Sequence, residues 1–213
     1  MTTAAPRQRR KDARPQELLD AALALFVEKG FAATRSEEVA ARAGVAKGTL
    51  YRYYPSKDEL FKAMVRENLS VHIVESAAQA AQYEGAISEL MRQMMRDWWA
   101  KVGRGNAGVV CKLVMIEARH FPELARFYVD EVIQPSKTLL GGMIERGIRR
   151  GEFRAVPIEA TVHLLISPML YMMLHEHSFG THDVCPGDMS PEELLEAQMS
   201  LLLHGLLATP PGT

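Results

Sequence analysis

Helical periodicity runs through almost the whole chain, and the alternating patterns of β-strands are nearly absent. Over residues 15–29, apolar side chains return every three or four positions, which places them on one face of an α-helix. Pro15 suits the first turn of this helix, and Gly30 suits the residue that follows its end. Similar segments follow, separated by glycine and proline. The sequence therefore predicts an all-α protein with about nine helices.

Short capped helices follow the first one. Thr34 and Glu37 have the spacing of a capping box, which predicts a short helix that stops at Gly44. Another short helix is expected over 46–54, and a long amphipathic helix is expected to begin after the cap at Ser56. A helix, a tight turn with glycine and a second helix form a helix-turn-helix, whose second helix enters a DNA major groove.

The charge of the chain is unevenly distributed. The formal net charge is -1, but residues 1–66 carry 13 Lys and Arg against 8 Asp and Glu, whereas residues 67–213 carry 12 against 18. A basic head on an acidic body suits a DNA contact confined to one end, because phosphate neutralisation is local. The alternative is an unstructured basic tail, since residues 7–14 supply five of the positive charges. Charge alone leaves both interpretations open.

Residues 15–64 resemble the tetracycline-repressor (TetR) family. The residues that carry this resemblance are Ala22, Phe26, Gly30-Phe31, Thr34, Val39-Ala40, Ala43-Gly44-Val45, Lys47-Gly48-Thr49-Leu50-Tyr51, Tyr53-Tyr54, Ser56-Lys57 and Leu60. Two positions depart from the family pattern. Thr34-Arg35-Ser36 stands where two threonines and an aliphatic residue are common, and Ala46 replaces a frequent capping serine. These departures bear on base preference and on the helix cap, and they leave the expected fold unchanged.

The resemblance implies a set of contacts to double-stranded operator DNA. The residues that it places at the DNA are Thr34, Arg35, Ser36, Lys47, Gly48, Thr49, Tyr51, Arg52, Tyr53 and Lys57. Those at 34–36 would bind phosphate at a helix start, those at 47–53 would lie in or beside the groove, and Lys57 would clamp a phosphate. Arg52 is the candidate reader of guanine, although outward arginines more often contact phosphate or solvent.

The body has no motif of comparable sharpness. Residues 121–128 and 147–153 look like the C-terminal half of the AefR-like branch of the family. The family resemblance implies an effector cavity and a homodimer formed by the last two helices, here about 157–179 and 191–207. Both segments are apolar on more than one face, which fits burial on two sides. Pro135 is expected to kink a helix over 122–150.

Methionines and aromatic residues are the candidate lining of that cavity. The candidates are Met94, Trp98, Met115, Phe127, Met143, Met169, Met172 and Met173. Flexible thioethers and aromatic faces suit a small apolar or aromatic effector, while plain core packing is the alternative for each residue. The sequence therefore predicts an effector of that class without identifying it.

Histidines and cysteines give weaker signals. His175 and His177, with His182 nearby, suggest a metal site. Side chains two positions apart on a helix point about 200° from each other, so His175 and His177 are not expected to share an ion. Cys111 and Cys185 are expected to be reduced thiols, and a sensing role for either group stays open. No metal and no cofactor are predicted.

These patterns favour a cytoplasmic, ligand-responsive transcriptional repressor over two other classes. An enzyme with a helical body would need a nucleophile elbow, a phosphate loop or paired carboxylates, and none is evident. A nonspecific architectural DNA-binding protein would not be expected to carry an acidic body. No uninterrupted apolar stretch approaches the roughly 20 residues that a membrane-spanning helix needs.

The expected domain organisation has four parts. We expect a disordered basic arm over 1–14 and a three-helix helix-turn-helix domain over 15–62. A six-helix effector-binding and dimerisation domain is expected over 63–208, followed by a disordered tail over 209–213.

Overall fold

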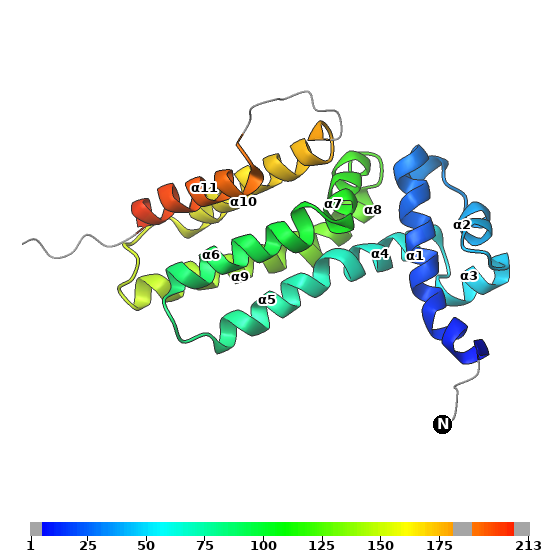
Figure 1. The fold of residues 1–213 in the computed structure, drawn as a ribbon, viewed down its shortest axis with the longest axis horizontal. Coiled ribbons are helices and arrows are strands. Elements are labelled where there is room, and N and C mark those ends of the chain that lie inside the picture. The colour runs from blue at the N-terminus through cyan, green and yellow to red at the C-terminus, as the bar shows by residue number, and fades with distance from the viewer. Residues whose placement is uncertain (1–5, 181–188, 207–213) are drawn as a thin grey trace, which may run out of the picture.

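The structure, a computed structural model, describes residues 6–180 and 189–206, and every long element in these parts is a helix. The helices are α1 (Pro6–Ala33), α2 (Ser36–Arg42), α3 (Lys47–Tyr53), α4 (Lys57–Val65), α5 (Val71–Gln82), α6 (Ile87–Trp98), α7 (Asn106–Glu117), α8 (Pro122–Tyr128), α9 (Gln134–Arg149), α10 (Ile158–Glu176) and α11 (Pro191–Leu206). A small head, made of α1 to α3 and the start of α4, lies at one end of an elongated body (Figure 1). The all-α prediction is confirmed.

Three π-helical turns lengthen the helices of the body. They are η1 (Arg66–Ser70) between α4 and α5, η2 (Trp99–Gly103) after α6, and η3 (Val129–Ile133) between α8 and α9. Counting each uninterrupted run as one helix, the described residues contain the nine helices that the sequence predicts. The longest link between head and body is the continuous run α4–η1–α5, which covers 57–82.

The predicted irregularity at Pro135 takes the form of the π-turn η3, which ends two residues before it. A proline has no N–H, so Pro135 cannot donate to the carbonyl of Glu131 four residues earlier. The hydroxyl of Ser70, on η1, donates to that oxygen instead, at 3.4 Å. The neighbouring helix therefore satisfies the acceptor that the proline leaves open.

Helix α1 differs from its prediction at both ends. It begins at Pro6, so the expected disordered arm over 1–14 is wrong for 6–14, while 1–5 lie outside the described residues. Pro15 lies inside the helix, because its φ is compatible with helical backbone and it removes only one hydrogen bond. Gly30 breaks the helical conformation with φ +84° and ψ 162°, three residues before the assigned end.

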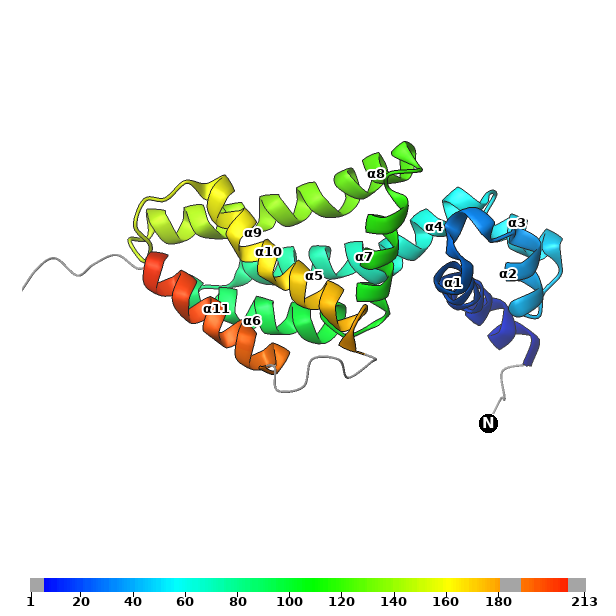
Figure 2. The same cartoon turned by 90° about the horizontal axis from the view of Figure 1, so that it is seen from above.

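Four phenylalanine rings join the head to the body. Phe31 contacts Phe26 at 5.3 Å and Phe61 at 5.0 Å between ring centroids. Phe121, which precedes α8 in the body, lies edge-on to Phe31 at 4.9 Å. Edge-to-face packing adds to the stabilisation from burying apolar area. Figure 2 shows the consequence: α7 lies beside the head where α4 leaves it.

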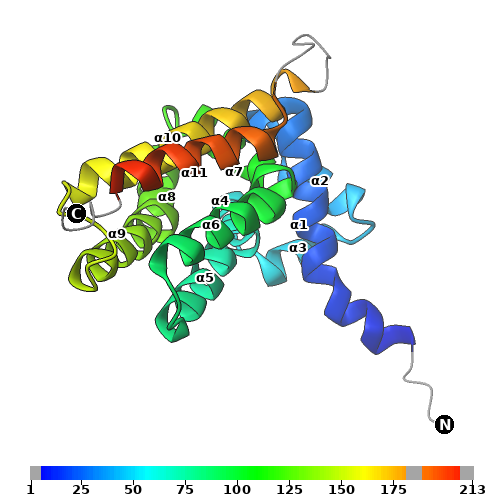
Figure 3. The ribbon, with the colours of Figure 1, turned by 60° about the vertical axis from the view of Figure 1, so that its left-hand side comes forward.

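Helices α10 and α11 lie side by side along one face of the body (Figures 1 and 3). They bury residues such as Leu165 and Met199 against the body but leave Leu164, Tyr171 and Leu201 exposed, the last of them 77%. Helix α10 is long and apolar enough to cross a membrane, by length and composition alone. The sequence pattern does not predict a membrane span in this segment. One face of α10 packs in the body, while its other face is exposed.

We predict that Phe61→Ala lowers the free energy of unfolding by about 3–5 kcal/mol, because a ring that is 1% exposed leaves a cavity in a packed cluster. Chemical denaturation at fixed protein concentration measures the change. Val27→Ala on α1 is the control, since Val27 is exposed and its truncation opens no cavity. A loss for Phe61→Ala as small as that of the control would contradict the role of the aromatic cluster.

Candidate nucleic-acid interface and cavity

Helix α3 is presented at the tip of the head by a tight turn after α2. Gly44 adopts φ +66°, Val45 N–H donates to the carbonyl of Ala40 at 2.9 Å, and Gly44 N–H donates to that of Ala41 at 3.1 Å. This pair of bonds is a Schellman motif, which needs a left-handed residue and explains the glycine. The predicted end of α2 at Gly44 is therefore correct.

Helix α3 fully buries a single side chain, Leu50, while Tyr53 is half-buried and packs against the core. Gly48, Tyr51 and Arg52 are exposed, as a helix that enters a groove requires. The guanidinium of Arg52 lies 5.3 Å from the ring centroid of Tyr53, which orders it along the helix. Thr49 is half-buried at the helix start. These positions agree with the sequence-based candidates, whose contacts to DNA stay a prediction.

Lys47 forms an ion pair with Glu37 of α2. The hydrogen bond from Lys47 lowers the pKa of Glu37, and the same bond raises the pKa of Lys47, so both groups stay charged. The pair is exposed, so water screens it and its contribution to stability is small. A phosphate at this position would have to compete with Glu37 for the ammonium.

The start of α2 differs from its predicted cap. The backbone N–H of Arg35, and not that of Thr34, donates to a side chain three residues later, the carboxylate of Glu38, at 2.8 Å. Glu38 also pairs with Lys29 at 2.6 Å. The capping box is thus shifted by one residue, because α2 begins at Ser36, which makes Arg35 the N-cap and Glu38 the third residue of the helix.

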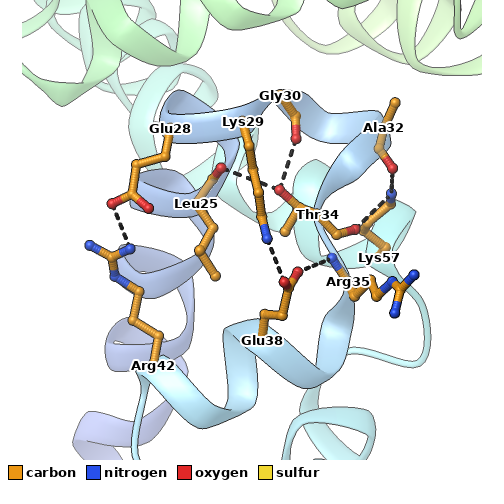
Figure 4. A network of polar contacts seen from close by, with 10 residues as sticks. All are labelled: Leu25, Glu28, Lys29, Gly30, Ala32, Thr34, Arg35, Glu38, Arg42 and Lys57. Carbon is orange, nitrogen blue, oxygen red and sulfur yellow. Dashed lines mark hydrogen bonds and ion pairs between the residues drawn. The ribbon is translucent and has the colours of Figure 1, made fainter.

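Thr34 and Ser36 are buried, which removes them from direct hydroxyl contact with phosphate in this conformation. The Thr34 hydroxyl donates to the carbonyl of Gly30 at 2.8 Å and lies 3.2 Å from that of Leu25 (Figure 4). It closes the end of α1 instead of facing solvent. Arg35 alone of this predicted trio is exposed.

Lys57 has a different role from the predicted phosphate clamp. Its ammonium donates to the carbonyls of Phe31, Ala32 and Thr34 at 2.7, 3.2 and 3.0 Å, and Figure 4 shows it turned toward this turn. An ammonium has three donors, and all three are used here. Burial lowers the pKa of Lys57. The lysine stabilises the turn between α1 and α2, and its phosphate contact, which would have to compete with these three carbonyls, stays a prediction.

A cavity of about 350 Å³ lies inside the body between α5, α6, α7, α9 and α10. Apolar residues dominate its lining, and a few charged ones, among them Lys101 and Lys137, lie at its rim. All three π-turns contribute lining residues: Leu69 from η1, Val102 from η2 and Val132 from η3. Such turns are frequent at functional sites because they displace side chains from regular positions.

Half of the predicted effector contacts line this cavity. Met94, Trp98, Met115 and Met169 do, whereas Phe127, Met143, Met172 and Met173 do not. Met143, Met172 and Met173 are buried elsewhere, so plain core packing accounts for them. Phe127 lies under the charged ends of Lys62 and Arg66. Periodicity identified buried faces but could not distinguish a face toward a cavity from one toward a neighbouring helix.

The cavity also contains polar residues that the sequence did not single out as effector contacts. Cys111 and Tyr128 meet in its wall at 3.1 Å between sulfur and hydroxyl oxygen. Burial raises the pKa of the Cys111 thiol and that of Tyr128, so both stay neutral and can bond a neutral polar group. At the rim, Lys101 and His72 contact Glu75 and lower the pKa of its carboxyl group.

The histidine group does not form a metal site among the residues described in 6–180 and 189–206. His177 Nε2 lies 2.8 Å from the carbonyl of Gly103, and the ring of His175 packs between Tyr171 and Phe179. His182 and Cys185 lie outside the described residues.

Two family descriptions match this chain. Residues 18–64 match "Bacterial regulatory proteins, tetR family", and residues 83–186 match "Tetracyclin repressor-like, C-terminal domain". The chain belongs to the TetR family. It is a DNA-binding transcriptional regulator, as the resemblance of 15–64 predicts. These matches do not distinguish the AefR-like branch, which stays a prediction.

Relatives and solved structures agree with this TetR assignment. The fatty acid metabolism regulator protein of Bacillus subtilis (strain 168) is 25% identical over 146 residues, 68% of this chain and 74% of that protein. The transcriptional repressor KstR2 of Rhodococcus jostii (strain RHA1) is 27% identical over 149 residues, 68% and 70% of the two chains. The crystal structure of FadR from Bacillus subtilis in complex with stearoyl-CoA superposes with a TM-score of 0.72 at 19% identity, covering 89% of this chain and 98% of that one. The superposition shows a shared fold of head and body.

We predict that Lys57→Met destabilises this TetR regulator by about 1–3 kcal/mol, because three carbonyls lose a charged donor. The slope of log operator affinity against log salt should stay that of the unmodified protein, since no phosphate contact is lost. Denaturation and salt titration measure the two effects, with Lys62→Met on the next turn of α4 as the control. A slope reduced by about one unit would restore Lys57 as a phosphate contact.

We predict that Cys111 reacts with iodoacetamide on the order of a hundredfold more slowly in the folded protein than in urea, because burial raises its pKa and blocks access. The measurement uses Cys185→Ser, so that a single thiol remains. A matched control places an exposed thiol one turn away, by Met115→Cys combined with Cys111→Ser and Cys185→Ser. Similar rates for Cys111 in both states would show that this wall of the cavity is open.

Proposed function

We propose that this protein is a dimeric cytoplasmic repressor that binds a palindromic operator and is released by an effector whose apolar part occupies the body cavity. The observation that carries the proposal is the continuous run α4–η1–α5, which begins in the head and lines the cavity with Leu69, His72 and Ile73. A displacement of this run by an effector must also move the head. Two heads must lie about 34 Å apart to enter successive major grooves, so a change in their spacing weakens binding.

The proposed DNA contacts are narrower than those inferred from sequence. Backbone and side chains of 47–53 enter or flank the groove, and Arg35 binds phosphate beside the start of α2. Arg52 is proposed to read a guanine through two hydrogen bonds. The acidic body keeps DNA at one end, which favours this function over an architectural DNA-binding protein. The proposed boundary between head and body at 62/63 falls within α4.

The proposed effector is an elongated molecule with a long apolar part and a polar end. The cavity wall is mostly methionine and aliphatic side chains. Lys101 and Lys137 at the rim pair with Glu75 and Glu159, so an anionic group of the effector would bind them by displacing these carboxylates. The relative named as a fatty acid metabolism regulator and the FadR complex with stearoyl-CoA support an acyl chain as the apolar part. Burying such a chain supplies several kcal/mol of binding free energy at about 25 cal/mol per Å².

The proposed dimer interface is the outer face of α10 and α11. Leu164, Tyr171 and Leu201 are exposed there on adjacent helices, and Leu164 and Tyr171 are seven residues apart, on one face of α10. A second copy related by two-fold symmetry would cover this apolar face with the same face.

We predict that Leu201→Glu converts the dimer to a monomer, because it buries a charge in the proposed interface. Light scattering coupled to size-exclusion chromatography measures the mass. Val74→Glu on α5 is the control, since Val74 is similarly exposed but lies away from α10 and α11. A monomeric unmodified protein, or dissociation by both substitutions alike, would contradict the interface.

The linkage between effector and operator tests the function itself. An operator is first selected from random DNA, and co-purified ligand is identified by mass spectrometry of the denatured protein. We predict that the ligand, or stearoyl-CoA as a probe, lowers operator affinity about a hundredfold, and that operator lowers ligand affinity by the same factor. A coupling free energy of about 2.7 kcal/mol is sufficient. Equal ligand affinities with and without operator would contradict the inducer mechanism even if both activities are real.

A further inference from the structure

Helix α7 has one face toward the cavity and another toward the head. Cys111 and Met115 line the cavity, and they lie four residues apart on one side of the helix. Glu117 follows Met115 by two residues, so it points about 200° away from it. The two faces are therefore opposite, and Figure 2 shows α7 between the body and α1.

Glu117 is a buried carboxylate that reaches across the junction. It is 8% exposed, and among the residues that the structure describes it is the charged residue that is buried. Its Oε1 accepts the backbone N–H of Phe31 at 2.9 Å, 86 residues earlier in the chain. The bond joins the body directly to the end of α1, from which the chain turns into α2.

The backbone at this junction leaves room for the carboxylate. A Cβ at Gly30 would lie 3.1 Å from Glu117 Oε1, and Gly30 has φ +84°, which side chains rarely adopt. On the other side of the same turn, Lys57 donates to the carbonyl of Phe31. The peptide groups around Phe31 are therefore held by a carboxylate from α7 and an ammonium from α4.

We propose that Glu117 is a positioning residue that transmits occupancy of the cavity to the DNA-binding head. A ligand against Cys111 and Met115 displaces α7, and the bond from Glu117 carries this displacement to the Phe31 amide. The turn between α1 and α2 then moves, and α2 and α3 move with it. The proposal rests on the cavity being the effector site, and α4–η1–α5 provides a parallel route.

The coupling factor, which is the ratio of operator affinities without and with stearoyl-CoA, tests this role. Glu117→Leu removes the acceptor at similar volume, and we expect the coupling factor to fall about tenfold while affinity for stearoyl-CoA stays unchanged. Glu117→Gln keeps an acceptor oxygen and should retain most of the coupling. Glu123→Gln, an exposed carboxylate on α8, is the control. An unchanged coupling factor in folded Glu117→Leu would overturn the proposal.

A second measurement needs neither an effector nor a Glu117 variant. Met115→Trp places a larger side chain on the cavity side of α7, which should displace the helix as a ligand would. We expect this substitution to speed hydrogen exchange of the Phe31 amide about tenfold and to weaken operator binding. The amide of Leu60, buried in the same head, should exchange as before. The proposal would be overturned if operator affinity changed while the exchange rate of the Phe31 amide did not, or if neither quantity changed. Failure of stearoyl-CoA to bind would instead count against the proposed effector class alone.

Discussion

The turn between α1 and α2 creates the polar groups on which the junction of the molecule depends. Where a helix ends, carbonyls and amides lose their helical partners, and leaving them buried and unpaired costs about 1–3 kcal/mol each. Here the Thr34 hydroxyl, the Lys57 ammonium and the Glu117 carboxylate satisfy such groups. They come from the turn itself, from α4 and from α7. Head and body are thus connected by polar bonds as well as by the packing of Phe31 on Phe121.

The body shows the opposite arrangement, in which regular structure is interrupted to leave space. A π-turn adds a residue to a helical turn and usually weakens its hydrogen bonding, so three of them in a small body are unexpected unless they position side chains. Each of the three contributes to the cavity lining. Ser70 and Pro135 show how these interruptions are accommodated. Pro135, which follows η3, cannot donate to the carbonyl of Glu131, and the hydroxyl of Ser70 on η1 donates to it instead. The cavity is therefore built into the backbone and does not result from small side chains alone.

The sequence predicted the features that depend on near neighbours. The end of α2 at its glycine, the approximate bounds of α3 and the cap at Ser56 follow from residues within one helical turn, and the structure has them all. Lys57 and Glu117 could not be assigned in this way, because their partners lie 23 to 26 and 86 residues away. An exposed lysine beside a DNA-binding helix and a lysine that bonds three carbonyls have the same local sequence. The lining of the cavity was half predictable for the same reason.

Ion pairs within the head occupy several of the basic side chains that could otherwise contact DNA. Glu28, Glu37 and Glu38 each hold a basic partner: Arg42, Lys47 and Lys29. The net positive charge of residues 1–66 therefore overstates the basic groups that are ready for phosphate. A phosphate that takes Lys47 from Glu37 replaces one anion with another and leaves the carboxylate unpaired beside the backbone. Because this exchange gives little net electrostatic gain, much of the affinity should come from Arg35, Arg52 and the backbone of α3. Of these, a phosphate contact of Arg35 would fix the position of the head, and a base contact of Arg52 would carry the sequence preference.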